Sequence, residues 1–218
     1  ALHHDQPTDP AWRDAMTNVL VQGCHVFRET GEYDRMIAAC RDAVGLIEES
    51  ARERPRDMQT RSDLGVQLGR LGSGYLVRNE IGAAHDAVTR GLEITREAAR
   101  NDPANTDWQN DLGMNEARTG EVLEAMGRHD DARAQWESAA ARMASLTGDG
   151  AALFMLDTRA CALILLGRSE EARPLVERLI AKGWNRRALL DLARTGGLVP
   201  AMPLGATAAP PGAPRSSG

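Results

Sequence analysis

Small and large apolar residues recur along this chain at fixed distances from four residues that favour a left-handed backbone. Those four residues, each expected to end a helix, are Gly31, Asn79, Gly127 and Gly167. Seven positions before each of them stands a small residue, at Cys24, Gly72, Gly120 and Ala160. Five positions after each stands a small or modest residue, at Met36, Ala84, Ala132 and Ala172. Because small side chains at facing positions let two helices approach closely, the pattern predicts four antiparallel helical hairpins.

Larger side chains are expected to fill the space beside the small ones. On the first helices they are Phe27, Tyr75, Leu123 and Leu163, and on the second helices they are Cys40, Val88, Trp136 and Val176. The second helices are expected to span about 32–54, 80–100, 130–146 and 169–181. Only 4% of the residues are aromatic, so the core must consist mainly of aliphatic residues and alanine, which suit helices better than sheets.

A short motif repeats with a period of 48 residues. It begins at Pro7, Pro55 and Pro103, and an Asp or Asn follows two positions later each time. In the first copy, Thr8 or Asp9 can cap a helix whose first residue is Pro10. A fixed period of about 20 to 50 residues is typical of a stacked array, in which each unit buries its apolar face against its neighbour. The sequence therefore predicts one elongated domain.

The expected domain covers residues 7–195. Its units span about 7–54, 55–102, 103–148 and 151–182, and a short helix at 186–195 is expected to cap the last unit. Residues 1–6 are expected to form a frayed leader. Residues 196–218 are rich in Pro, Ala and Gly, which predicts a disordered tail.

The order small, large, glycine, alanine, aromatic resembles the tetratricopeptide repeat. The best match is in the third and fourth units, at Gly120, Leu123, Gly127, Ala132, Trp136 and Ala139, and at Ala160, Leu163, Gly167 and Ala172. The first unit departs most, with Met36 and Cys40 where the family usually has alanine and an aromatic residue. The unit is also longer than the family's usual length of about 34 residues. The resemblance implies an all-α fold, an α-solenoid of about four antiparallel hairpins in a right-handed superhelix with a short C-terminal capping helix.

Composition and charge argue against several classes of partner. The formal net charge of -5 provides no general attraction to nucleic acid or to anionic lipid. No apolar run approaches the roughly 18 to 20 residues that span a bilayer, and the N-terminus has no signal-like core. Three cysteines without CxxC spacing favour a reduced compartment, so the protein is expected to be cytoplasmic.

No group of residues predicts catalysis, a cofactor or a metal. The stretch from Gly69 to Gly74 has the order GxxGxG and lacks a following Lys, so it does not match a phosphate-binding loop; the helical spacing of Gly65, Gly69 and Gly72 favours a packing role. His25, His85 and His129 lie in different units without metal-ligand spacing. Cys24 and Cys40 face each other in the first hairpin. The default interpretation is two buried thiols, and a redox-formed bridge is the alternative.

The candidate site is the inner face formed by the first helices of successive units. The residues placed there are Asn18, Val21, His25, Arg28, Val66, Gly69, Ser73, Val77, Met114, Ala117, Glu121, Glu124, Phe154, Asp157, Cys161 and Ile164. This mixed surface, with an apolar strip between basic and acidic ends, could accept an extended or helical peptide. The alternative is that many of these residues only contact the next helix in the stack.

Two functions follow. The first is a non-catalytic scaffold that binds a peptide or a partner protein in the concave groove. The second rests on the resemblance, because longer repeats of this type are similar to arrays attached to catalytic domains in bacterial signalling proteins. The chain would then be a C-terminal regulatory segment of a larger enzyme such as a serine/threonine kinase.

Overall fold

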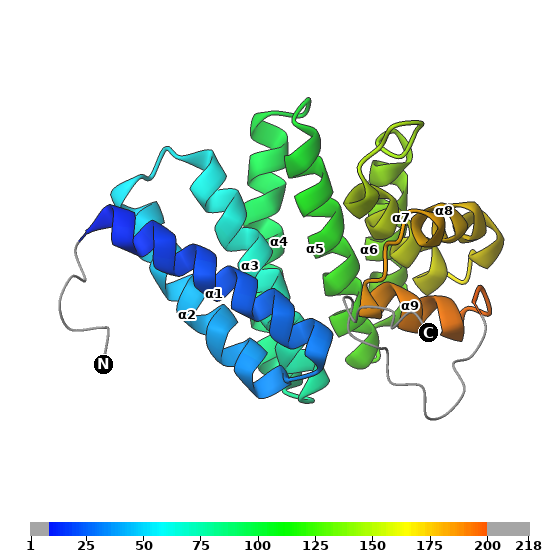
Figure 1. The fold of residues 1–218 in the computed structure, drawn as a ribbon, viewed down its shortest axis with the longest axis horizontal. Helices are drawn as coiled ribbons and strands as arrows, with labels where there is room; N and C mark the ends of the chain where they lie inside the picture. Colours follow the sequence, from blue (N-terminus) through cyan, green and yellow to red (C-terminus); the bar gives the residue numbers. More distant parts are fainter. Residues whose placement is uncertain (1–8, 200–218) are drawn as a thin grey trace, which may run out of the picture.

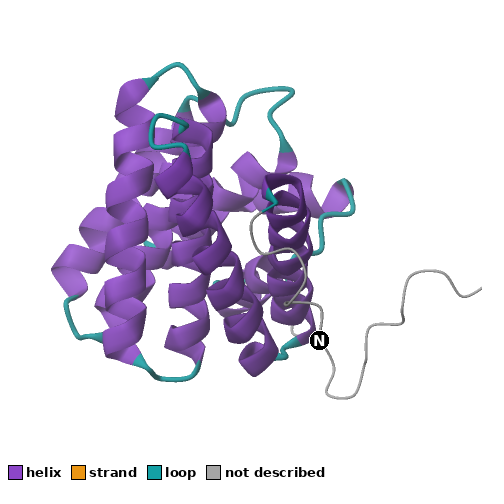
Figure 2. Ribbon diagram, turned by 90° about the vertical axis from the view of Figure 1, so that its left-hand side faces the viewer, coloured by secondary structure: helices purple, strands orange, loops and turns teal. Residues whose placement is uncertain are grey.

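The computed structural model describes residues 9–199, and all its regular elements in that range are helices (Figures 1 and 2). They are α1 (Pro10–Thr30), α2 (Tyr33–Glu53), α3 (Met58–Val77), α4 (Ile81–Asn101), α5 (Thr106–Ala125), α6 (His129–Ala144), α7 (Leu153–Leu165), α8 (Ser169–Ala181) and α9 (Arg187–Thr195). The second helices of the hairpins agree with their expected spans within two residues at each end. The predicted leader at 1–6 and residues 200–218 of the predicted tail lie outside the described residues. Residues 196–199 of that tail are described, and Leu198 and Val199 pack against the C-terminal core.

The four predicted helix ends are confirmed by the backbone. Gly31, Asn79, Gly127 and Gly167 have φ angles of 79°, 59°, 75° and 73°, all in the left-handed region. After each of them the next backbone N–H donates to a carbonyl five residues back, as in Glu32 to Phe27 (2.8 Å) and Arg128 to Leu123 (2.9 Å). These bonds satisfy carbonyl groups that the helix itself leaves unpaired. The hairpins therefore turn where the sequence predicts.

The 48-residue motif marks the start of the first helix in three units. The Asp9 side chain accepts from the Ala11 backbone N–H at 2.9 Å, and the Asp57 side chain accepts from that of Thr60 at 3.2 Å. Asn105 Oδ1 accepts from two backbone N–H groups, both at 3.1 Å. Because the first N–H groups of a helix have no partner within it, these side chains fix where each hairpin begins.

Glycines allow the helices to pack closely in the middle of the array. A Cβ at Gly120 would lie 2.3 Å from Trp136 Nε1, so the absence of a side chain leaves room for the indole ring. That ring is anchored by a hydrogen bond from Nε1 to the Ala117 carbonyl (3.1 Å). In the same way, a Cβ at Gly69 would lie 2.0 Å from Oδ1 of Asn115, which belongs to the next hairpin. The glycine spacing therefore serves packing.

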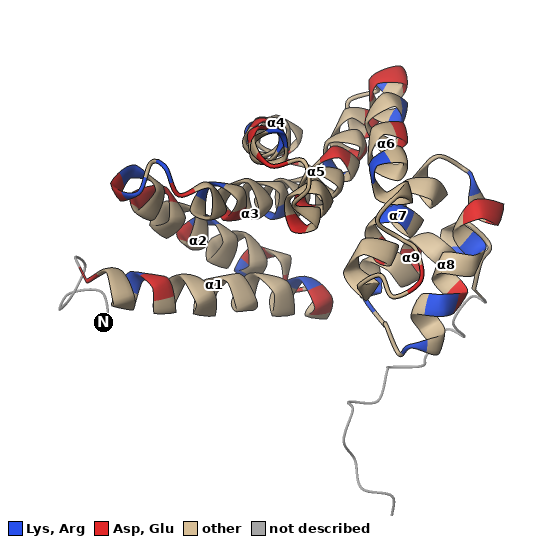
Figure 3. Ribbon diagram, turned by 90° about the horizontal axis from the view of Figure 1, so that it is seen from above, with Lys and Arg blue, Asp and Glu red and all other residues tan. Residues whose placement is uncertain are grey.

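The hairpins stack into an α-solenoid. Figure 3 shows α1, α3, α5 and α7 curving round one side, while α4 and α6 lie on the outer side. The short helix α9 packs against α7 and buries Leu189 and Ala193. The end of α1 lies beside the start of α9, where the Arg187 backbone N–H donates to Glu29 Oε2 (2.9 Å) (Figure 1). The two ends of the described array thus contact each other across the inner side.

The default interpretation of Cys24 and Cys40 as two free thiols is wrong in this structure, because they form a disulfide. Their Cα atoms are 5.3 Å apart, and both side chains are almost completely buried between α1 and α2. The bridge forms because the small position of the first helix faces the larger position of the second, as Gly120 faces Trp136 in the third hairpin, and in the first unit both positions are cysteine. It joins two helices that are also held by apolar packing around Met36 and Ile47.

We expect Cys24→Ala with Cys40→Ala to lower the free energy of unfolding by about 2 kcal/mol, the lower end of the usual range because the closed loop is short. Urea unfolding of the oxidised protein, the reduced protein and the double variant measures this. The reduced protein and the variant should unfold at similar urea concentrations, both below that of the oxidised protein. Equal midpoints for the oxidised and reduced protein, with the bridge verified by mass, would contradict the expectation.

Candidate functional site

A hollow of about 920 Å³, here called the inner hollow, lies between α1, α3, α5 and α7. Five of the residues predicted for the inner face line it, namely Asn18, Val21, Val66, Met114 and Phe154. Four of them occupy one register position, separated by the same 48, 48 and 40 residues that separate the helix ends. The stacking of the hairpins brings equivalent positions into one row.

Three members of the row, Val66, Met114 and Phe154, form an apolar strip across the inner hollow. Val66 is buried, Met114 is half-buried and Phe154 is 40% exposed, so the strip becomes more accessible towards α7. An exposed phenylalanine ring keeps a large apolar area in water, which is unfavourable unless a ligand covers it. The strip can therefore contribute binding energy to an apolar side chain.

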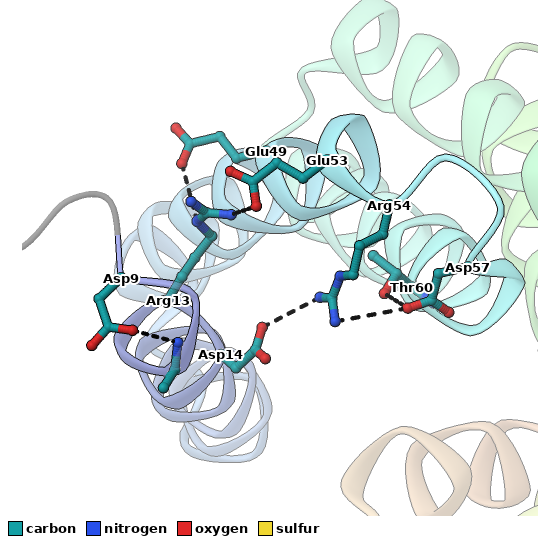
Figure 4. A network of polar contacts seen from close by, with 9 residues as sticks. Asp9, Arg13, Asp14, Glu49, Glu53, Arg54, Asp57 and Thr60 are labelled. Atoms are coloured by element: carbon teal, nitrogen blue, oxygen red, sulfur yellow. Dashed lines mark hydrogen bonds and ion pairs between the residues drawn. The ribbon is translucent and has the colours of Figure 1, made fainter.

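Charged groups surround this strip. Five aspartates and two arginines line the inner hollow. Two of the aspartates share one arginine at the rim, where Arg54 pairs with Asp14 (3.4 Å) and with Asp57 (3.8 Å) (Figure 4). Asp63, Asp107 and Asp111 remain, with Arg70 as the other cation of the lining. The lining of the hollow therefore has more negative than positive charge.

Burial makes ionisation of two of these carboxyl groups costly. It raises the pKa of Asp111 to about 6, although a hydrogen bond from the Ser62 hydroxyl (3.0 Å) acts in the opposite direction. It also raises the pKa of Asp63, which accepts a hydrogen bond from Gln59 Nε2 at 2.9 Å. A cation placed between them would favour both charged forms.

Four further predicted residues line a smaller hollow of about 170 Å³ beside α9, here called the α9 hollow. They are Arg28, Ser73, Val77 and Glu121. Arg187, Ala188 and Asp191 of α9 form its opposite wall. Burial raises the pKa of Glu121, which is opposed by the positive charges of Arg28, Arg118 and Arg186. This part of the inner face is thus partly occupied by the protein's own last helix.

The other seven predicted residues line neither hollow. Asp157 and Ile164 are covered by the segment 184–196: Trp184 Nε1 donates to Asp157 (3.0 Å), and Ile164 lies against Gly196. Cys161, which the sequence also places on this face, is buried there as well.

The remaining four residues lie elsewhere. Gly69 packs against Asn115 of the next hairpin. Ala117 is buried in the helix packing. Glu124 is exposed at the hairpin turn, where it pairs with His129 (2.9 Å). His25 lies exposed on α1. Since the C-terminal segment folds back over α7, the inner face open to a partner is shorter than the sequence implies.

Sequence reasoning missed the polar lining of the inner hollow. Asp63 and Asp111 are separated by 48 residues, as are Arg70 and Arg118, so both pairs repeat with the array. The acidic pair lies three positions before Val66 and Met114 and the basic pair four positions after them. Residues three and four apart share a helix face, so this repeat could have found them.

The fold and the hollow define the chain as a helical-repeat protein of the α-solenoid class. No family model matches the chain, and no curated protein matches it. Among solved structures, the crystal structure of the MamA protein is similar, with 16% identity over 86% of this chain and 98% of that chain and a TM-score of 0.24. A likeness at that score carries no argument about this protein.

Two further observations concern the part of the chain that the structure describes. No cluster of three or more His, Cys, Asp or Glu residues is placed there to hold a metal ion. Within residues 9–199, none of the helices combines the length and the apolar character needed to cross a bilayer.

Proposed function

We propose that this chain is a non-catalytic interaction module of tetratricopeptide type, and that its inner hollow binds a segment of a partner protein. The observation that carries the proposal is the apolar strip of Val66, Met114 and Phe154. It lies on three consecutive first helices and inside a hollow that has a polar rim. Recognition of peptides by helical arrays commonly combines apolar anchor positions with surrounding polar groups.

The dimensions of the hollow favour a polypeptide segment. It extends from Asn18 on α1 to Phe154 on α7 and so crosses all four hairpins. An extended segment advances about 3.3 Å per residue and can contact several hairpins at once. Each contact adds apolar area, while the rigid helices supply a surface that is already formed.

A peptide-display selection followed by calorimetry tests the proposal. Random twelve-residue peptides are selected on the whole chain, and their affinities are measured for the wild type, Phe154→Glu and Ile180→Glu. Phe154 and Ile180 are 40% and 44% exposed, but only Phe154 lines the inner hollow. We expect Phe154→Glu to weaken binding about tenfold or more, because a charge replaces an apolar anchor.

Ile180→Glu is the matched control and should leave the affinity unchanged. Circular dichroism should show the same helix content in all three proteins. If the selected peptides bind Phe154→Glu as tightly as the wild type, or if none binds the wild type, the inner hollow is not a peptide site.

A further inference from the structure

The inner hollow has more negative than positive charge in its interior. Once Arg54 has paired with Asp14 and Asp57, the lining retains Asp63, Asp107 and Asp111 against Arg70 alone. Asp111 on α5 accepts a hydrogen bond from the hydroxyl of Ser62 (3.0 Å), the residue before Asp63 on α3, and both carboxyl groups line the hollow. Two like charges in a partly buried hollow repel each other, and a cation between them would relieve the repulsion.

A second observation in the same wall also indicates a ligand. The Gln67 side chain lines the inner hollow, is only 4% exposed, and its Oε1 accepts no hydrogen bond from the described residues. A buried amide oxygen without a donor is unfavourable. This buried oxygen lies in the same wall as two acceptor groups, the carboxylates of Asp63 on α3 and Asp111 on α5.

The protein's own C-terminal segment shows how this inner face accepts a donor. Asp157 on α7 accepts a hydrogen bond from Arg186 Nη2 at 2.7 Å and one from Trp184 Nε1 at 3.0 Å. An arginine and an apolar ring, both from an irregular segment, therefore satisfy an inner-face carboxylate. The inner hollow offers the same combination of carboxylate and apolar surface two hairpins away.

We propose that the inner hollow recognises a basic segment, with an arginine or lysine side chain between Asp63 and Asp111 and an apolar side chain on the strip of Val66, Met114 and Phe154. This inference rests on the proposed function and names the chemistry of the partner. Arginine fits best, because its planar guanidinium can donate to two carboxylates at once.

Binding of such a segment is expected to depend on pH. Asp111, whose pKa is about 6, becomes protonated as the pH falls from 7.5 to 5.5 and then no longer attracts a cation. The charged groups that act on it are Asp63 on α3, Asp107 on its own helix, Arg118 and Arg70. The affinity should therefore decrease towards acidic pH.

Three libraries of random twelve-residue peptides test the proposal, each with a fixed central pair of arginine, glutamine or glutamate. Selection on the whole chain at pH 7.5 should enrich the arginine library. Fluorescence anisotropy should show that Asp63→Asn with Asp111→Asn weakens the selected peptides about tenfold or more. The matched control, Asp42→Asn with Asp86→Asn, removes two exposed charges outside the inner hollow and should have little effect.

The outcomes separate this inference from the proposed function. If glutamine or glutamate peptides bind as tightly as arginine peptides and still depend on Phe154, the hollow binds peptides but not basic ones, and the inference is wrong. If no library yields a binder that Phe154→Glu weakens, the proposed function fails as well. At pH 7.5 the melting temperature of the double variant should be no lower than that of the wild type, because ionised Asp111 destabilises the fold. This measurement checks that weaker binding does not result from unfolding.

Discussion

Asp157→Ala is expected to lower the free energy of unfolding by about 3 to 4 kcal/mol. Asp157 is 3% exposed and accepts hydrogen bonds from Arg186 and Trp184, with which it holds the C-terminal segment on α7. Removing the carboxylate leaves Arg186, whose side chain is 23% exposed, without its opposite charge. Urea unfolding followed by circular dichroism measures the loss.

The same variant should expose Cys161. This thiol is buried and lies 3.2 Å from Arg186 Nη2, and burial raises its pKa well above the usual range. In Asp157→Ala the covering segment is held less tightly, so alkylation of Cys161 by iodoacetamide should be faster than in the wild type. Cys161 is the cysteine that remains outside the disulfide, so the modified thiol can be assigned directly.

Glu170→Ala is the control for this prediction. Its carboxylate also pairs with an arginine, Arg173 at 2.8 Å, but the glutamate side chain is 83% exposed. An exposed pair contributes little because water already solvates both charges. The contrary result is an Asp157→Ala protein as stable as Glu170→Ala, with Cys161 reacting no faster than in the wild type. That result would show that apolar packing alone holds the segment 184–196 on α7.

Gly91→Leu is expected to lower the free energy of unfolding by about 3 kcal/mol or more. A Cβ at Gly91 would lie 2.7 Å from the Gly65 carbonyl oxygen and 3.1 Å from the Gly69 backbone nitrogen. Both are backbone atoms that cannot rotate away, so α3 and α4 would have to separate along their contact. Thermal and urea unfolding report the effect, and weaker near-ultraviolet dichroism would report looser packing.

Gly45→Leu makes the same substitution in the middle of α2, where no atom lies within 4 Å of the added Cβ. There the change should stabilise the protein by up to about 1 kcal/mol, because glycine is a poor helix former. Comparing the two variants separates the effect of helix propensity on the free energy of unfolding from the effect of the contact between α3 and α4. A Gly91→Leu protein as stable as the wild type would mean that α3 and α4 do not pack backbone to backbone.

Only part of the candidate site could be predicted from the sequence. The register placed Val66, Met114 and Phe154 on one face, and the structure brings them together in the inner hollow. It also placed Asp157 and Ile164 there, but the chain's own segment 184–196 covers both. A repeat register gives the face on which a residue lies, and it does not say what covers that face.

Short stretches of sequence are sufficient to set where the hairpins begin and end. Asp9, Asp57 and Asn105 cap helices through side-chain hydrogen bonds to nearby backbone groups, and Gly31 and Gly127 end them through their own φ angles. These are local properties, and neighbours within a few residues decide them.

Contacts between distant parts of the chain depend on how the hairpins stack. It brought Glu29 to the start of α9, laid Arg186 on Asp157, and enclosed Asp63 and Asp111 in one hollow. The reason is that the curvature of the array accumulates from small rotations between successive hairpins. No short stretch of sequence specifies that sum. The repeat could have placed Asp63 and Asp111 on one face, but only the folded chain shows the hollow that they line and the C-terminal segment that covers α7.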